Sequence, residues 1–173
     1  MAKIEVNRVT NANVYLNGNS LLGRAREIEL PEVTHQMAEH EGMGLYGSPE
    51  FPSGLEAMEA SITWAAFYKD VLEAAGNPFE VVRLQIRTSV DTFTGQGLTS
   101  QVPLVCHLRG VFKNHPLGTF KKGENVELGH QLTIYYFKQV FDGEDVLEVD
   151  VLENVMKRRG EDLLAQWRTN LGA

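Results

Sequence analysis

Alternation of apolar and polar residues dominates the chain and recurs with the period of two that β-strands impose. It is clearest in four segments, residues 57–64, 81–90, 101–112 and 128–140. Strands with this pattern bury one face against a core and leave the other face in water. Shorter strands are expected in three further segments, residues 12–17, 24–30 and 145–151. The pairs Asn17-Gly18 and Asp142-Gly143 are typical of hairpin turns between strands.

The alternation also predicts which side chains face the core. In residues 57–64, Met58, Ala60, Ile62 and Trp64 alternate with Glu59, Ser61 and Thr63. In residues 101–112 the expected core face carries Val102, Leu104, Cys106, Leu108 and Phe112. In residues 128–140 it carries Leu128, Leu132, Ile134, Tyr136 and Val140. Polar side chains occupy the opposite faces of these strands, so each strand is expected to be half-buried.

Two segments have helical spacing instead. Residues 66–75 place Phe67, Val71, Leu72 and Ala75 on one stripe, and Gly76 with Pro78 predicts the end of that helix. Residues 161–171 place Leu163, Leu164, Trp167 and Leu171 on one stripe, with Glu161 and Asp162 suited to a helix N-terminus. Seven or eight strands and two helices in 173 residues indicate one mainly β domain over residues 1–173, a β-sandwich or barrel with helical cover.

Residues 39–54, EHEGMGLYGSPEFPSG, combine loop-forming and apolar residues. Four glycines and two prolines predict a loop, yet the segment also carries Met43, Leu45, Tyr46 and Phe51. Exposed apolar residues of this kind usually mark a protein interface. The alternative is that the loop folds back over its own core.

Composition excludes some classes of function. The formal net charge of -7 argues against nucleic-acid binding by neutralisation of phosphates. The single cysteine, Cys106, allows no intramolecular disulfide. The N-terminus has no apolar signal region, and no apolar run approaches the roughly 20 residues that span a bilayer, so no membrane association is expected.

Candidate catalytic and metal-binding residues do not form a convincing site. His35 and His40, with Glu39 and Glu41 nearby, are five residues apart and match no metal-binding framework. Cys106 and His107 are adjacent in a strand and point to opposite faces, so Cys106 is better interpreted as a small buried hydrophobe than as a nucleophile. The basic cluster of residues 157–159 suits a salt bridge to a neighbour as well as nucleic acid. We therefore expect no enzyme activity, no metal and no cofactor.

Seven short motifs, in order along most of the chain, resemble the major tail tube proteins of contractile-tailed bacteriophages and of R-type bacteriocins (tailocins). They are NANVYLNG (11–18), IELPEVT (28–34), EHEGMGLYG (39–47), GLEAMEA (54–60), LRG (108–110), YYFKQVFDGEDVLEVDVLENV (135–155) and GEDLLAQWRTNLGA (160–173). Each motif alone is a common structural signature. The seven motifs in this order along most of the chain are specific to the family.

The resemblance implies a structural subunit that forms hexameric rings, which stack into a hollow tube. The implied fold is a two-sheet β-sandwich or barrel with one flanking helix and a short C-terminal helix. The implied partners are other copies of the chain, a tail sheath protein, a tape-measure protein, a baseplate initiator and a tail terminator. DNA would pass through the lumen without specific binding. The protein would belong to a virion tail assembled in the host bacterial cytoplasm, and the sequence leaves phage, tailocin and other contractile injection systems open.

Within the resemblance, residues of two regions acquire roles. The long loop at about residues 35–55 would reach neighbouring subunits, with Met43, Leu45, Tyr46 and Phe51 as its anchors. A tube also needs a polar, net-negative inner wall that repels DNA phosphates. By strand parity the expected lumen-lining residues are Glu27, Glu29, Glu59, Ser61, Thr63, Gln131 and Thr133. Arg83, Gln85 and Arg87 are expected to face outward.

The alternative function is a small-ligand- or carbohydrate-binding β-sandwich. Such a module should be monomeric and should carry an aromatic-lined cleft. Only 9% of the residues are aromatic, and we expect most of them in the core, which disfavours this alternative. A hydrolase with a hidden site has no supporting set of residues.

Overall fold

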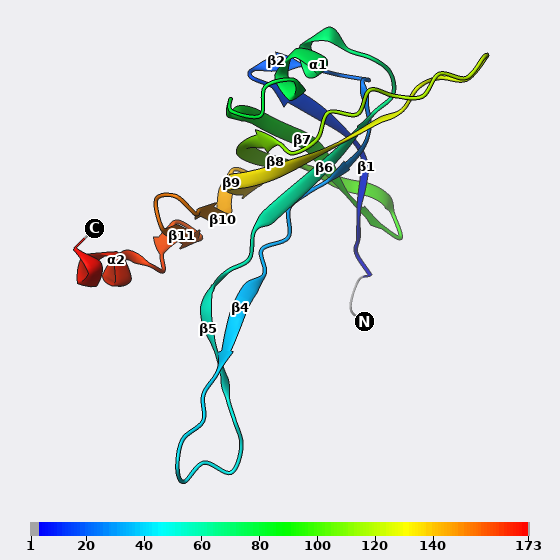
Figure 1. The fold of residues 1–173 in the computed structure, drawn as a ribbon. Coiled ribbons are helices and arrows are strands. Elements are labelled where there is room, and N and C mark those ends of the chain that lie inside the picture. Colours follow the sequence, from blue (N-terminus) through cyan, green and yellow to red (C-terminus); the bar gives the residue numbers. More distant parts are fainter. Residues whose placement is uncertain (1–3, 173) are drawn as a thin grey trace.

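The computed structural model describes residues 4–172, so the expected single domain over residues 1–173 extends beyond the described residues at both ends. Within that range lie twelve strands and two short helices (Figure 1). They are β1 (Val6–Leu16), β2 (Asn19–Ser20), β3 (Ala25–Glu29), β4 (His35–Glu39), β5 (Glu50–Leu55), β6 (Met58–Trp64), α1 (Lys69–Ala75), β7 (Val82–Thr94), β8 (Gly97–Phe112), β9 (Leu128–Phe141), β10 (Glu144–Asp150), β11 (Val155–Arg158), β12 (Glu161–Asp162) and α2 (Ala165–Leu171).

Strand β9 is the hub of a ten-stranded sheet. One side of β9 pairs with β8 over residues 132–141. Its other side is divided, because residues 128–134 pair with β6 whereas residues 136–141 pair with β10. The sheet therefore forks at β9 into two layers. One layer is β3-β6 with the first half of β9, and the other runs through β12-β11-β10, β9, β8, β7, β1 and β2.

The fork confirms the mainly β, two-layered fold with two helices that the sequence predicts. The two layers are parts of one hydrogen-bonded sheet rather than separate sheets, and the sheet does not close into a barrel. In the described part of the chain, β3, β2 and β12 each pair with a neighbour on one side only.

The core lies between the two layers. Alternation over residues 57–64 is confirmed, since Met58, Ala60, Ile62 and Trp64 are buried while Glu59 is exposed. The facing layer contributes apolar side chains from β1, β7 and β8, among them Val14, Leu16, Val82, Leu84, Ile86, Cys106, Leu108 and Phe112. Helix α1 adds Val71 and Ala75 to the same core, as its predicted apolar stripe requires.

The predicted core face of β9 is wrong beyond Ile134. The pairing of β8 with β9 shifts between Arg109 and Gly110, so one extra residue of β9 is accommodated there as a bulge. A one-residue shift exchanges the two faces of a strand. Phe137 therefore takes the buried position, whereas Tyr136 and Val140 lie on the outer face.

Both helices are shorter than predicted. Helix α1 begins at Lys69 rather than residue 66 and ends before Gly76. Helix α2 begins at Ala165, because Glu161 and Asp162 form strand β12 instead of a helix N-terminus. The Asp162 carboxylate accepts hydrogen bonds from Arg168, which ties α2 to the strand that precedes it.

Two strand glycines differ sharply in the space around them, and this difference yields a prediction. A methyl group added at Gly110 would lie 2.0 Å from the Thr133 carbonyl oxygen, whereas at Gly129 the nearest atom would be 3.9 Å away. We expect Gly110→Ala to lower the free energy of unfolding by about 2–3 kcal/mol, since β8 and β9 must separate at the bulge. The control Gly129→Ala should be neutral or slightly stabilising. Urea unfolding of both variants is the measurement, and equal effects would contradict the close approach at Gly110.

His130 is a polar residue inside the apolar core. Its side chain is fully buried, and neither ring nitrogen has a hydrogen-bond partner. The ring packs edge-on against Phe112, with ring centroids 5.3 Å apart, and His115 lies 6.0 Å away. Burial, and secondarily His115, lower the pKa of His130, and a smaller contribution from the Leu128 backbone offsets this in part.

Acid should therefore destabilise the fold through His130. The unfolded chain takes up a proton on this imidazole near its ordinary pKa of about 6.5, whereas the folded chain does so only at lower pH. The unfolded state then binds more protons, so stability falls as the pH drops below about 6.5. We expect His130→Leu to raise stability at pH 7 by about 1–2 kcal/mol and to flatten its fall with acid. Urea unfolding from pH 7.5 to 5 measures both, and an unchanged pH dependence would contradict the assignment.

Candidate assembly surfaces

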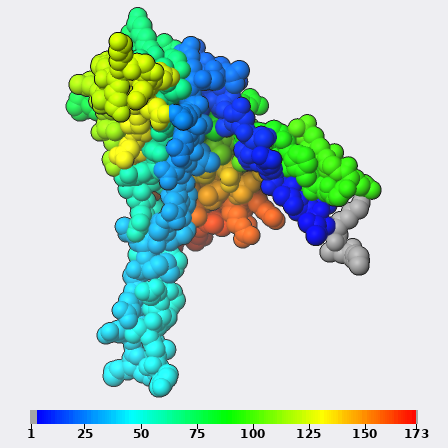
Figure 2. All heavy atoms as spheres, turned by 90° about the vertical axis from the view of Figure 1, so that its right-hand side faces the viewer, coloured from blue at the N-terminus to red at the C-terminus, as the bar shows by residue number. Residues whose placement is uncertain are grey.

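Residues 35–55 form a hairpin arm that stands away from the sheet. Strands β4 and β5 pair with each other and form a separate two-stranded sheet. Figures 1 and 2 show this arm extending from the start of β6 into open space. The predicted glycine-rich loop is thus a hairpin with strands at both ends, and only residues 40–49 form an irregular tip. A two-stranded hairpin with no covering layer is only marginally stable in water.

The four predicted anchors all lie exposed on the arm. Met43 and Tyr46 at the tip are fully exposed, and Leu45 and Phe51 keep about half of their surface in contact with solvent. The nearest aromatic neighbour of Phe51 is the His40 ring of the arm itself, with centroids 6.3 Å apart. The alternative that this segment folds back over its own core is therefore wrong for the single subunit. The role of these residues as anchors on a neighbour remains a prediction.

The seven predicted lumen-lining residues share one face of the β3-β6-β9 layer. The register places Glu27 opposite Thr63 and Glu29 opposite Ser61 across β3 and β6. Across β6 and β9 it pairs Ser61 with Gln131 and Glu59 with Thr133. Residues directly opposite in an antiparallel pair point to the same side. This polar face lies on the opposite side of the layer from the core residues Met58, Ala60, Ile62 and Trp64.

Hydrogen bonds and charges organise the polar face further. Ser61 donates a hydrogen bond to the Glu29 carboxylate at 2.9 Å. Lys113, just beyond β8, donates to the Glu59 carboxylate. The face therefore carries three carboxylates and one ammonium group, and it is polar with a net negative charge.

Further apolar side chains are exposed in places that the sequence pattern did not identify. They lie on the paired ends of β1, β7 and β8, on the segment before β9 and around α2, and they include Val6, Val9, Phe93, Leu98, Leu117, Phe120, Leu152, Leu163, Trp167 and Leu171. Helix α2 has no buried residue at all. The expectation that most aromatic residues lie in the core is therefore wrong: among those described, Trp64, Phe112 and Phe137 are buried, whereas most others are exposed. Exposed apolar groups on several projections indicate a protein that is completed by contacts with other chains.

A charged network fixes the C-terminal strands to the sheet. The Arg109 guanidinium lies 4.1 Å from the centroid of the Tyr136 ring and binds the Asp150 carboxylate at 2.8 Å. Tyr136 donates to Glu148, and Lys157 binds the same carboxylate. Burial, followed by the contact with Glu148, raises the pKa of Tyr136 to about 12, so the phenol stays protonated. Lys157, a member of the basic cluster, is thus engaged within its own chain.

The residues considered for catalysis are separated by the fold. Cys106 is buried in the core, and burial raises the pKa of its thiol to about 11, which leaves very little nucleophilic thiolate at neutral pH. His107 lies on the other face of β8. Over residues 4–172 no group of three or more His, Cys, Asp or Glu side chains is arranged to hold a metal ion. No helix in this range is long and apolar enough to cross a membrane.

An open sheet with unpaired strand edges and exposed apolar projections is typical of a subunit that assembles with other chains. The fold is similar to that of a chain in the cryo-EM structure of an extracellular contractile injection system, the PVC sheath-tube complex in its extended state. That match has a TM-score of 0.54 at 10% identity and covers 75% of this chain and 86% of the other. At this identity the likeness shows the fold alone.

Comparison of sequences identifies the family. The family model for phage tail tube protein FII matches residues 6–172, and the chain belongs to this family. It is 32% identical over 171 residues to the tail tube protein of Escherichia phage P2, covering 92% of this chain and 94% of the relative. It is 26% identical over 152 residues to the major tail tube protein of Serratia phage KSP20, covering 87% and 86%.

Membership in this family confirms the resemblance carried by the seven motifs, and the chain is a structural tail tube subunit. The family is a structural one, which favours a role without catalysis. The alternative of a small-ligand- or carbohydrate-binding module is not favoured.

The exposed arm tip gives a prediction that separates folding from assembly. Because Met43 and Tyr46 contact no core residue, Met43→Ser with Tyr46→Ser should change the free energy of unfolding by less than about 0.5 kcal/mol. The same variant should lose the ability to form tubes, since it lacks two apolar anchors. Urea unfolding and negative-stain microscopy measure the two effects, with Ser48→Ala as the control on the same tip. Normal tube formation by the double variant would contradict the anchor role.

Proposed function

We propose that copies of this subunit form hexameric rings that stack into a hollow tube, with the polar β3-β6-β9 face turned toward the lumen. The observation that carries this proposal is the gathering of seven polar side chains from three strands on one face of one layer. A face lined by Glu, Ser, Thr and Gln stays hydrated and offers few contacts to a passing molecule. Its net negative charge repels the phosphates of DNA.

The bare strand edges support the closure of a ring. An exposed edge offers unpaired N–H and C=O groups to any other chain, so it is a hazard in a protein that remains single. Strand β3 has its free edge beside the polar face, and pairing with a neighbouring copy would continue that face around a ring. Head-to-tail contacts of this kind close when the rotation between copies closes, and stacking then extends the ring into a tube.

The arm and the other projections suit contacts between copies in the same ring and in adjacent rings. Their apolar residues are exposed in the single subunit and would be buried on assembly. A marginal hairpin loses conformational entropy when it docks, and this cost slows assembly until a template is present.

The proposed partners follow from this arrangement. A tail sheath protein would surround the tube, a tape-measure protein or DNA would occupy its lumen, a baseplate initiator would start it and a tail terminator would end it. The tube would form in the host bacterial cytoplasm and become part of a virion tail. DNA would pass through without specific binding, and the same design would serve a tailocin.

Charge reversal on the polar face tests the lumen assignment. Glu27→Lys with Glu29→Lys removes two carboxylates whose side chains point to this face, whereas β3 would pair with a neighbour through its backbone, so tubes should still form. The inner wall would then attract DNA, and tubes should retain a short fluorescent duplex that wild-type tubes exclude, with retention falling as salt is raised. Co-sedimentation of duplex with tubes measures this, and the control is Glu144→Lys at the exposed start of β10. Reversed tubes that exclude the duplex as the wild type does would contradict the assignment.

A further inference from the structure

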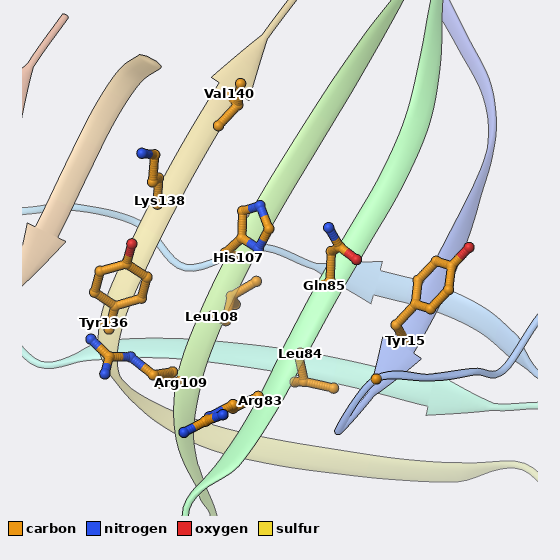
Figure 3. A pocket seen from close by; sticks show the side chains of 11 residues that line it. Tyr15, Arg83, Leu84, Gln85, His107, Leu108, Arg109, Tyr136, Lys138 and Val140 are labelled. Carbon is orange, nitrogen blue, oxygen red and sulfur yellow. The ribbon is translucent and has the colours of Figure 1, made fainter. Parts of the chain in front are cut away.

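A cationic groove lies on the outer face of the β1-β7-β8-β9 layer, away from the core and from the polar face. It has a volume of about 440 Å³. Figure 3 shows Tyr15, Arg83, His107, Arg109, Tyr136 and Lys138 along it, contributed by four adjacent strands. The Tyr136 and Tyr15 rings lie at opposite sides of the groove in Figure 3, with His107 and Gln85 between them.

The positive charge of the groove is only partly neutralised. Arg109 binds Asp150, and Lys138 binds Asp145 at 2.7 Å. Among the described residues, Arg83 and Arg87 have no ion-pair partner and share the outward face of β7. Arg83 lines the groove, whereas Arg87 lies beside it and lines a neighbouring depression. Burial and the nearby cations Lys138 and Arg87 lower the pKa of His107, as expected at a site of positive potential.

The arm has the opposite charge. Residues 27–68 contain no lysine or arginine, although the chain has 16 of them. The arm within this stretch carries Glu39, Glu41 and Glu50. Glu39 lies directly opposite Glu50 in the pairing of β4 with β5, and like charges in opposed positions destabilise a hairpin. The free arm thus holds unneutralised negative charge beside the exposed rings of Tyr46 and Phe51.

We propose that the arm of one copy docks in the cationic groove of a neighbouring copy, with the carboxylates at the base of its tip facing Arg83 and Arg87. This inference rests on the proposed tube. The tip residues Met43 and Tyr46 are fully exposed, so the arm does not occupy the groove of its own chain. The five residues of β4 and the irregular tip beyond them give the arm a reach of up to roughly 30 Å, which suits a contact with another subunit.

The arm is favoured over other acidic occupants because each copy carries one arm and one groove. A contact between two different surfaces of the same chain is heterologous and repeats along an assembly without a second protein. It brings the arm carboxylates to unpaired cations and covers the arm's aromatic residues in the same step. An acidic segment of a sheath protein could meet the same charges, and the experiment below separates the two.

A charge exchange tests the contact. Glu39→Lys with Glu50→Lys reverses the arm but keeps like charges opposed, so the free arm should be equally stable. Arg83→Glu with Arg87→Glu reverses the two unpaired cations in and beside the groove without breaking an ion pair of the subunit. Each reversal alone should lower the yield of tubes, seeded or at high concentration, by about tenfold or more. The chain carrying all four changes should restore the yield to within about threefold. Lys69→Glu at the exposed start of α1, outside the groove, the arm and the apolar projections, is the control and should assemble normally.

Cross-linking gives a second measurement. Cys106 is buried, so cysteines introduced by Ser48→Cys on the arm tip, which leaves its apolar anchors in place, and by Gln85→Cys in the groove react against a low background. Treated with a mild oxidant, tubes of the double variant should form disulfide-linked ladders, whereas Ser48→Cys paired with Leu117→Cys should not.

The outcomes separate the two proposals. Wild-type chain that forms no tubes even when seeded would overturn the proposed function. Wild-type tubes that form while both reversed variants also assemble would overturn the arm-to-groove contact alone. If the groove variant builds normal tubes but fails to recruit sheath, the groove belongs to the sheath and the inference is wrong.

Discussion

Hydrogen bonding along β9 is the constraint on which the rest of the structure depends. One side of this strand pairs with β8, and the other side divides its partners between β6 and β10. The division creates two layers from one sheet, and the layers enclose the core. The bulge beside Gly110 lies next to the point of division and exchanges the faces of β9 there. It thereby sends Phe137 into the core and Tyr136 outward, where Tyr136 joins the network that fixes the C-terminal strands.

This fork leaves the subunit with more edges and projections than one chain can cover. Closing the sheet on itself would have removed the edges, but the layers diverge instead. The arm, the end of β1 with the β7-β8 hairpin, and helix α2 all present apolar residues to solvent. In a monomeric protein such residues promote indiscriminate aggregation. In a tube protein these exposed apolar residues are useful because each projection can bury them at a defined site on another copy.

Much of the fold could be predicted from the sequence, since period-two alternation reports which face of a strand is buried. The polar positions of β6, from Glu59 to Thr63, were identified in this way. The outward turn of Tyr136 could not be predicted, because a bulge leaves no mark in the alternation until the partner strand is known. The prediction that most aromatic residues lie in the core failed for a different reason. Burial against a neighbouring copy requires the same apolar residues as burial in the core, so the helical stripe that carries Trp167 has the same pattern in both cases.

The distribution of charge reconciles association with a net charge of -7. Uniformly spread charge of one sign would make copies of the chain repel one another. Here residues 27–68, which include the arm and much of the polar face, contain no lysine or arginine, whereas Arg83 lines the outer groove and Arg87 lies beside it. The carboxylates of the polar face then repel anions that pass it. The acidic arm of one copy and the cations at the groove of another attract each other. Apolar anchors supply affinity that salt does not screen, and the charges orient the approach. A subunit arranged in this way can be soluble alone and still associate in one geometry.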